Sequence, residues 1–216
     1  MTPFPDVGRW WISCYVGAPM KLYYVPFTRS NRPRWLLEEL GVPYELVRLD
    51  PKAGETRSDE HTSRHPLQHV PVLDTPDGSL FESAALVLQI ADLHGRLIPA
   101  VGSFERGLVY QWLFFAMTEL EPHCVTYFAE KVKKKTPQSE LALEAKRKVN
   151  HAAKVVNAEL GSREWMLPSG FSVADVVLGS VAWWANRMSA LEAVPNVVAY
   201  VERIVARPAY QRAVID

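Results

Sequence analysis

The feature that most constrains the fold is a change of hydrophobic periodicity part-way along the chain. Up to about residue 97, short alternating or β-branched runs are interleaved with one-faced helical patterns. Beyond about residue 104, only helical periodicity is found. Strands and helices followed by helices alone predict two domains, the first α/β and the second all-α. We therefore expect an N-terminal extension, an α/β domain, a linker and an all-helical domain, at residues 1–19, 20–97, 98–104 and 105–216.

The α/β domain is predicted to have the order β-α-β, loop, β-β-α. A helix between two strands implies a parallel strand pair with a crossover, and the Asp77-Gly78 turn signal indicates an antiparallel hairpin. The expected strands are residues 21–25, 44–49, 70–74 and 79–81, and the expected helices of this domain are about 31–40, 57–64 and 82–94. Helices of the second domain are expected at residues 104–134, 138–160, 172–190 and 195–206.

Composition disfavours several classes of partner. Lys plus Arg and Asp plus Glu each number 24, so the formal net charge is zero, and we expect neither nucleic acid nor membrane as a partner. The two cysteines, Cys14 and Cys124, form no C-x-x-C pair, which favours a reducing, cytoplasmic setting. Residues 10–18 resemble a weak signal-peptide core, but Asp6 upstream disfavours secretion.

Four motifs, in this order and spacing, resemble those of the glutathione S-transferase family. They are KLYYVPFTRSNRPRWLLEELGVPYE, HPLQHVPVL, LFESAALVLQIAD and GFSVADVVL, at residues 21–45, 65–73, 80–92 and 170–178. Each motif is weak alone, whereas all four in register are specific. The resemblance covers residues 20–216 and implies a thioredoxin-like N-terminal domain followed by a C-terminal helical bundle.

The resemblance places part of a glutathione site around the Val70-Pro71 pair. A cis bond there would leave the Val70 N–H and C=O for the cysteinyl part of glutathione, which would add as a short strand. An ordinary trans proline at the start of a strand is the alternative. His69, or Gln68 beside it, is implied to reach the glycyl carboxylate, and an exposed loop histidine is the alternative for His69.

Glu82 and Ser83 stand at the predicted start of a helix, where N–H groups and the helix dipole favour an anion. The resemblance implies that Ser83 binds the γ-glutamyl carboxylate of glutathione and that Glu82 faces the ammonium group. Helix capping by Ser83 is the alternative, and it is compatible with binding.

The catalytic group is expected in the loop that follows the first strand. A free thiol has a pKa of about 8.5, so its activation requires stabilisation of the thiolate, for example by a hydroxyl donor near a helix N-terminus. The resemblance puts Thr28 at the serine-type position and Arg29 where some bacterial members carry a cysteine. Ser30 is predicted mainly to be the N-cap of the next helix. Thr28 is therefore favoured over Ser30, and Arg29 adds positive charge.

The second domain is expected to contribute an apolar pocket and a structural motif. Tyr110 and Phe114, with Phe27 of the first domain, are the candidates for the electrophile pocket. Ser172 and Asp175 form an S-x-x-D capping box, which we assign a structural role.

The resemblance implies an enzyme of detoxification, a glutathione S-transferase that activates the glutathione thiol for attack on a small apolar electrophile. It also implies a homodimer, with glutathione as co-substrate and no cofactor. His61, His65 and His69 are spaced by four, but Pro66 interrupts them and no ligand pattern is completed, so no metal is expected. A glutathione-dependent disulfide reductase or isomerase is one alternative function, and a non-catalytic binding module of the same fold is another.

Overall fold

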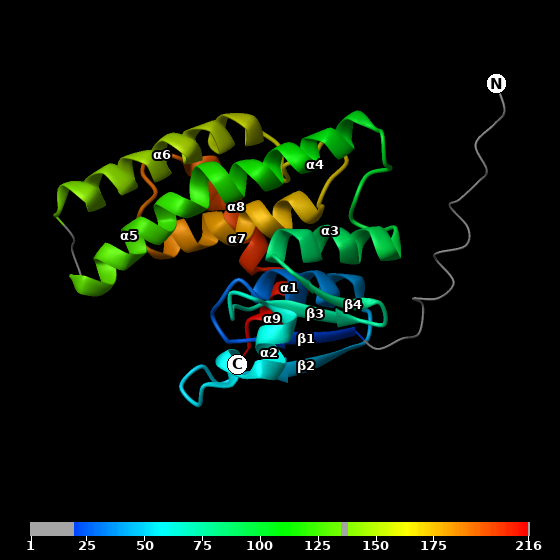
Figure 1. Cartoon of the computed structure of the whole chain (residues 1–216). Helices are drawn as coiled ribbons and strands as arrows, with labels where there is room; N and C mark the ends of the chain where they lie inside the picture. Colours follow the sequence, from blue (N-terminus) through cyan, green and yellow to red (C-terminus); the bar gives the residue numbers. More distant parts are fainter. Residues whose placement is uncertain (1–19, 135–137, 216) are drawn as a thin grey trace, which may run out of the picture. The chain divides into compact units, whose positions relative to one another are not determined.

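The computed structural model describes residues 20–134 and 138–215 (Figure 1), so the predicted extension at residues 1–19 lies outside the described residues. The chain divides into two compact units. One is formed by residues up to Gly95 together with those from Ala213 onward, and the other is Arg96–Arg212. No helix within the described ranges is long and apolar enough to cross a lipid bilayer.

The first unit is built on a mixed four-stranded sheet of order β2-β1-β3-β4. Its strands are β1 (Met20–Tyr24), β2 (Tyr44–Arg48), β3 (Val72–Thr75) and β4 (Gly78–Phe81). β1 and β2 are parallel, with Leu22 opposite Leu46, which confirms the predicted β-α-β unit. β3 is antiparallel to both β1 and β4, and the hairpin predicted from Asp77-Gly78 is present.

The helices of the first unit are α1 (Asn31–Leu40), α2 (Asp59–Arg64) and α3 (Ser83–His94), with a 3-10 turn at Glu55–Arg57. α1 and α3 pack on each other on one side of the sheet (Figure 1). Their apolar faces and the sheet form the core, in which Leu22, Leu36, Leu73 and Leu86 are fully buried. α1 ends at Gly41, whose φ of 64° is the left-handed value that glycine accepts without cost.

Two predicted boundaries are corrected by the backbone around Pro71 and Glu82. β3 begins at Val72 and not at residue 70, since Pro71 has no N–H to give to a strand ladder. α3 begins at Ser83, because Glu82 has φ 74° and ψ 107°, which are not helical.

The second unit is helical, as predicted. Its elements are α4 (Phe104–Phe115), a π-helical turn (Ala116–Leu120), α5 (Glu121–Lys133), α6 (Glu140–Leu160), α7 (Val173–Arg187), α8 (Pro195–Val205) and α9 (Pro208–Ala213), which reaches the unit boundary. The single helix expected over residues 104–134 is thus interrupted by one π turn, and α9 was not predicted. α6 packs along α5, and α7 packs against both α4 and α8 (Figure 1).

The predicted capping box at the start of α7 is confirmed. The Asp175 carboxylate, which is 0% exposed, accepts hydrogen bonds from the Ser172 N–H at 2.8 Å, the Met166 N–H at 2.9 Å and the Tyr200 hydroxyl at 3.0 Å. Burial raises the pKa of Asp175 to about 6, and these hydrogen bonds oppose the rise. One carboxylate therefore ties α7 to α8 and to the loop before α7.

Candidate functional site

Val70, in the segment between α2 and β3, has a backbone that takes no part in the hydrogen bonds of the described residues. The Val70-Pro71 peptide bond is cis, as predicted. Val70 is partly exposed, and its N–H and C=O make no backbone hydrogen bond to any residue in the described ranges. Because β3 starts only two residues later, this N–H and C=O can extend the sheet toward a peptide-like ligand.

Histidine rings hold the loop that leads to Val70. The His61 ring of α2 is 2% exposed, and its Nε2 lies 2.8 Å from the carbonyl oxygen of His69. His65 accepts the Leu67 N–H on Nδ1 at 3.2 Å, and its ring centroid lies 4.5 Å from that of Phe81. Burial, and then the nearby His69, lower the pKa of His65. The His69 side chain is exposed, so it can reach a ligand at Val70.

Ser83 is the first residue of α3, and its hydroxyl has a buried cationic partner. Arg32 of α1 donates from Nη1 to Ser83 Oγ at 3.0 Å, and the two residues are 4% and 2% exposed. The N-cap position of α3 belongs to Glu82, which makes no side-chain capping bond, so the alternative that Ser83 caps the helix is wrong. Because Ser83 accepts from Arg32, its own hydroxyl proton remains for another acceptor. The Glu82 side chain is exposed.

The loop before α1 links the two candidate hydroxyl groups. The Thr28 hydroxyl lies 2.7 Å from the Val25 carbonyl and 2.9 Å from the Ser30 hydroxyl, and it accepts the Ser30 N–H at 3.3 Å. Thr28 is partly exposed and Arg29 is exposed, whereas Ser30 is 0% exposed. Of the two hydroxyl residues, Thr28 is thus the one that solvent or a ligand reaches.

The prediction that Ser30 is the N-cap of α1 is confirmed for its position and wrong for its side chain. Ser30 occupies the N-cap position of α1, but its side chain makes no capping bond. Its φ of −61° and ψ of −22° are helical, whereas a capping serine needs an extended backbone to reach the N–H groups ahead of it.

The three residues predicted for an electrophile pocket are all exposed. Phe27 belongs to the first unit, and Tyr110 and Phe114 belong to the second. Phe27 of the first unit is 80% exposed and has a φ of 58°. Tyr110 and Phe114 lie one helical turn apart on α4 and are 38% and 68% exposed. The Tyr110 hydroxyl accepts a hydrogen bond of 2.8 Å from Arg106 Nε. The α4 residues therefore form an accessible aromatic face.

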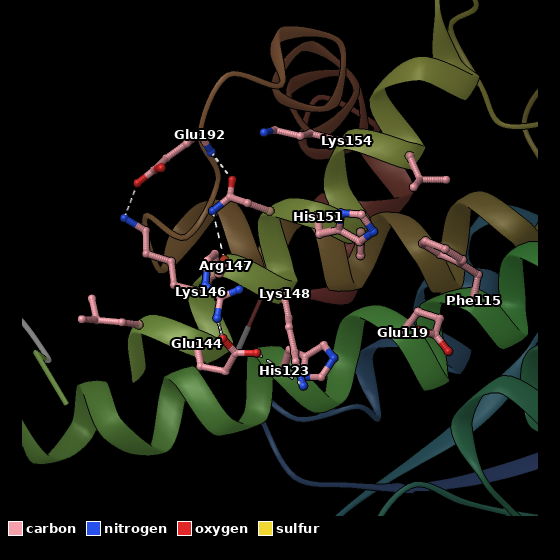
Figure 2. A pocket seen from close by; sticks show the side chains of 14 residues that line it. Phe115, Glu119, His123, Glu144, Lys146, Arg147, Lys148, His151, Lys154 and Glu192 are labelled. Atoms are coloured by element: carbon pink, nitrogen blue, oxygen red, sulfur yellow. Dashed lines mark hydrogen bonds and ion pairs between the residues drawn. The ribbon is translucent and has the colours of Figure 1, made fainter. Parts of the chain in front are cut away.

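A hollow of about 1070 Å³ in the second unit contains none of the predicted site residues. It lies along α6 and the π turn with α5 (Figure 2), and Figure 2 shows Lys146 directed at Glu192, with which it pairs. Glu144 pairs with Arg147 and with Lys148. Since most of its charges neutralise one another, the hollow offers no built site for a single ligand. Within the described ranges, no group of three or more His, Cys, Asp or Glu residues is arranged to hold a metal ion.

Comparisons with known proteins identify the family of the chain. Residues 18–92 match the family model "Glutathione S-transferase, N-terminal domain", and residues 115–208 match "Glutathione S-transferase, C-terminal domain". The chain is 30% identical over 205 residues to the probable glutathione S-transferase GSTF2 of Oryza sativa subsp. japonica, a match that covers 90% of this chain and 95% of the relative. The chain belongs to the glutathione S-transferase family.

Two further proteins are similar to this glutathione S-transferase. A glutathione transferase family member from Pseudomonas fluorescens Pf-5, solved with two glutathione bound, is 25% identical with a TM-score of 0.80, over 90% of this chain and 92% of that chain. The disulfide-bond oxidoreductase YfcG of Escherichia coli K12 is 27% identical over 215 residues, which is 90% of this chain and 94% of the relative. The family assignment makes this chain an enzyme of the glutathione transferase type.

Two residues of this glutathione S-transferase that support the candidate site were not singled out as such from sequence. Arg32 lies in the helical motif that carried the resemblance, and the available signal was a charged residue among the buried positions of α1, because a buried guanidinium requires a partner. The sequence pattern makes His61 a candidate only for metal binding. Its position on the buried side of a short polar helix was the signal for a structural hydrogen bond.

Proposed function

We propose that this glutathione S-transferase binds glutathione along the Val70 backbone and the Ser83 hydroxyl, and that Thr28 holds its thiol as the thiolate. The observation that carries the proposal is the Val70 N–H and C=O, which make no backbone hydrogen bond in the described ranges beside the start of β3. The peptide backbone of glutathione supplies the complementary donor and acceptor.

The γ-glutamyl end of glutathione is proposed to bind at the N-terminus of α3. Its carboxylate accepts hydrogen bonds from the Ser83 hydroxyl and from the backbone N–H groups of the first turn, where the helix dipole favours an anion. The buried Arg32 guanidinium, 3.0 Å from Ser83 Oγ, adds a permanent positive charge behind this hydroxyl. Glu82, exposed beside it, faces the ammonium group, and His69 reaches the glycyl carboxylate.

Thr28 is proposed to donate a hydrogen bond from its hydroxyl group to the thiolate sulfur of glutathione. In the structure the proton of this hydroxyl group is shared between the Val25 carbonyl and Ser30 Oγ, at 2.7 and 2.9 Å. When Thr28 turns its proton to the sulfur, the Ser30 hydroxyl can donate to Thr28 Oγ1 in its place, because a hydroxyl both donates and accepts. Ser30 then supports the donor, and the exposed Arg29 adds positive charge.

The thiolate attacks an electrophilic carbon, a C–S bond forms, and the leaving group departs with its electron pair. We propose that the second substrate is a small apolar electrophile, for which Tyr110 and Phe114 are the candidate contacts in the second unit and Phe27 is the candidate in the first. We also propose a cytoplasmic homodimer, as the family resemblance and the low cysteine content imply. The domain boundaries stay as proposed, with residues 20–97 binding glutathione and residues 105–216 contributing the apolar side chains.

Calorimetric titration with glutathione tests this proposal. The parent should bind saturably, and Ser83→Ala should weaken binding roughly tenfold, as expected for loss of a hydrogen bond to a charged group. Transfer to an aromatic chloride is then measured with the parent and Thr28→Val. No binding by the parent at about ten millimolar glutathione, where millimolar affinity is detectable, would contradict the proposal.

A glutathione-dependent disulfide reductase or isomerase is the second candidate. The similarity to the disulfide-bond oxidoreductase YfcG favours it, and the Thr28 loop fits it equally well because stabilisation of a thiolate serves both reactions. Activity on a glutathione mixed disulfide, together with no transfer to aromatic chlorides, selects this candidate over the transferase.

A further inference from the structure

His61 contacts the peptide group that carries the Val70 N–H. Its Nε2 lies 2.8 Å from the carbonyl oxygen of His69, the residue directly before Val70. A carbonyl oxygen only accepts hydrogen bonds, so Nε2 carries the proton and donates it. The ring is 2% exposed. The backbone of His61 is part of α2, and the hydroxyl of Ser58, the N-cap of that helix, accepts the His61 N–H at 3.1 Å.

The bond between His69 and Val70 transmits this contact. It is not among the cis peptide bonds of the described chain, and in a planar trans peptide the C=O and the N–H point in opposite directions. Because the His61 ring holds the His69 oxygen on the α2 side, the Val70 N–H is directed away from α2. A carbonyl that accepts a hydrogen bond also polarises its own amide, which makes the N–H of the same peptide a stronger donor.

We propose that His61 is a positioning residue for glutathione, one that aims and polarises the Val70 N–H through the His69-Val70 peptide. This inference rests on the proposed function, in which that N–H pairs with the cysteinyl backbone of glutathione. His61 touches neither the thiol nor the γ-glutamyl group. Its contribution is therefore to affinity for glutathione, while the pKa of the bound thiol depends on Thr28.

Three substitutions separate this role from simple packing. His61→Gln places an amide N–H near the position of Nε2 and keeps the donor. His61→Asn also has an amide donor, but its side chain is too short to bring that donor to the His69 carbonyl. His61→Phe keeps an aromatic ring but has no donor. Ile90→Val, at a fully buried position of α3 in the same unit, is the control for a mild loss of stability without loss of the donor.

Glutathione affinity is measured by calorimetry for each variant, thermal stability is recorded in parallel, and the Val70 amide proton is followed by NMR. We expect His61→Phe and His61→Asn to bind about three- to tenfold more weakly, His61→Gln to bind nearly as the parent does, and the pKa of the bound thiol to stay unchanged. The glutathione-induced shift of the Val70 amide proton should shrink in His61→Phe and return in His61→Gln.

Two results would overturn the inference while leaving the proposed function standing. One is a parent that binds glutathione, weakens with Ser83→Ala, and is indifferent to all three His61 substitutions. The other is equal weakening by His61→Gln, His61→Phe and His61→Asn that merely follows stability, as Ile90→Val does. A parent that binds no glutathione overturns the proposed function and the inference together, so the failures are distinguishable.

Discussion

Arg32 and Ser83 lie 51 residues apart in the sequence, and they meet through a 3.0 Å hydrogen bond between Nη1 and Oγ. Both side chains are buried, at the beginnings of α1 and α3. A guanidinium stays charged at every accessible pH, so this contact places a fixed positive charge beneath the hydroxyl that we assign to the γ-glutamyl carboxylate. The pair also links α1 to α3, which pack on each other next to the sheet.

Replacing Arg32 should therefore weaken glutathione binding. Arg32 would act through Ser83 and not by contact with the sulfur of glutathione. We expect Arg32→Met to lower glutathione affinity by about tenfold or more, since hydrogen bonds that involve charged groups contribute about 1.5–3 kcal/mol. Calorimetry on Arg32→Met, Ser83→Ala and the double variant measures the coupling between them. Additive losses would show that Arg32 and Ser83 act independently, contrary to our account.

Substitutions in the Thr28 loop should affect the reaction in a graded way. Thr28→Val removes the donor and should lower kcat about a hundredfold, as the loss of one donor to a developing anion does in other enzymes. Thr28→Ser keeps the hydroxyl and should stay near the parent, and Ser30→Ala should have a smaller effect because Ser30 only supports Thr28. Steady-state kinetics that gave Ser30→Ala the larger loss would reverse the assignment.

The free energy of unfolding should decrease in acid because of His65. Burial and the neighbouring His69 lower the pKa of His65 in the folded chain, so the unfolded chain takes up the proton first as the pH falls. The free energy of unfolding therefore decreases as the pH drops below about 6.5, the ordinary pKa of histidine.

The matched variant for this effect is His65→Phe, which keeps an aromatic ring against Phe81 and does not titrate. Denaturant unfolding of the parent and the variant at several pH values should show a shallower acid loss for His65→Phe. Parallel curves for the two proteins would contradict the assignment to His65.

Asp175 should be among the most sensitive positions for stability. Its carboxylate accepts the Met166 and Ser172 N–H groups and the Tyr200 hydroxyl, so Asp175→Ala leaves several buried donors without a partner. We expect a loss of about 3–5 kcal/mol in the free energy of unfolding, measured by urea denaturation. Tyr200→Phe removes only one of these bonds and should cost clearly less, and equal losses for both would contradict this account.

Gly179 permits the close approach of α7 and α8. A Cβ at this position would collide with the Ile204 side chain, so Gly179→Ala should lower the free energy of unfolding by about 1–3 kcal/mol, as overpacking of a core does. Adding Ile204→Val, which removes the colliding methyl group, should recover part of that loss. A double variant less stable than the sum of its single changes would argue against the collision.

Much of the fold follows from local patterns in the sequence. The β-α-β unit, the Asp77-Gly78 hairpin and the capping box at Ser172 and Asp175 were predicted, because each depends on residues close together in the chain. The cis Val70-Pro71 bond was also predicted, from the family motif around it.

The features that sequence reasoning missed depend on distant partners or on individual backbone angles. Arg32 finds Ser83 only after α1 and α3 pack together, which no local pattern specifies. Ser30 was assigned a capping role that its helical φ and ψ prevent. Buried residues follow one another at helical spacing from Leu113 to Cys124, across the π turn at Ala116–Leu120, so periodicity alone predicts one helix.

The most direct test of the account is the titration of the glutathione thiol in its complex with the parent, followed by the ultraviolet absorbance of the thiolate. We predict an apparent pKa clearly below the value of about 8.5 for a free thiol, and a return toward that value in Thr28→Val at saturating glutathione. A bound thiol that titrates like the free thiol, or a lowered pKa that Thr28→Val leaves unchanged, would contradict the central claim that Thr28 stabilises the thiolate.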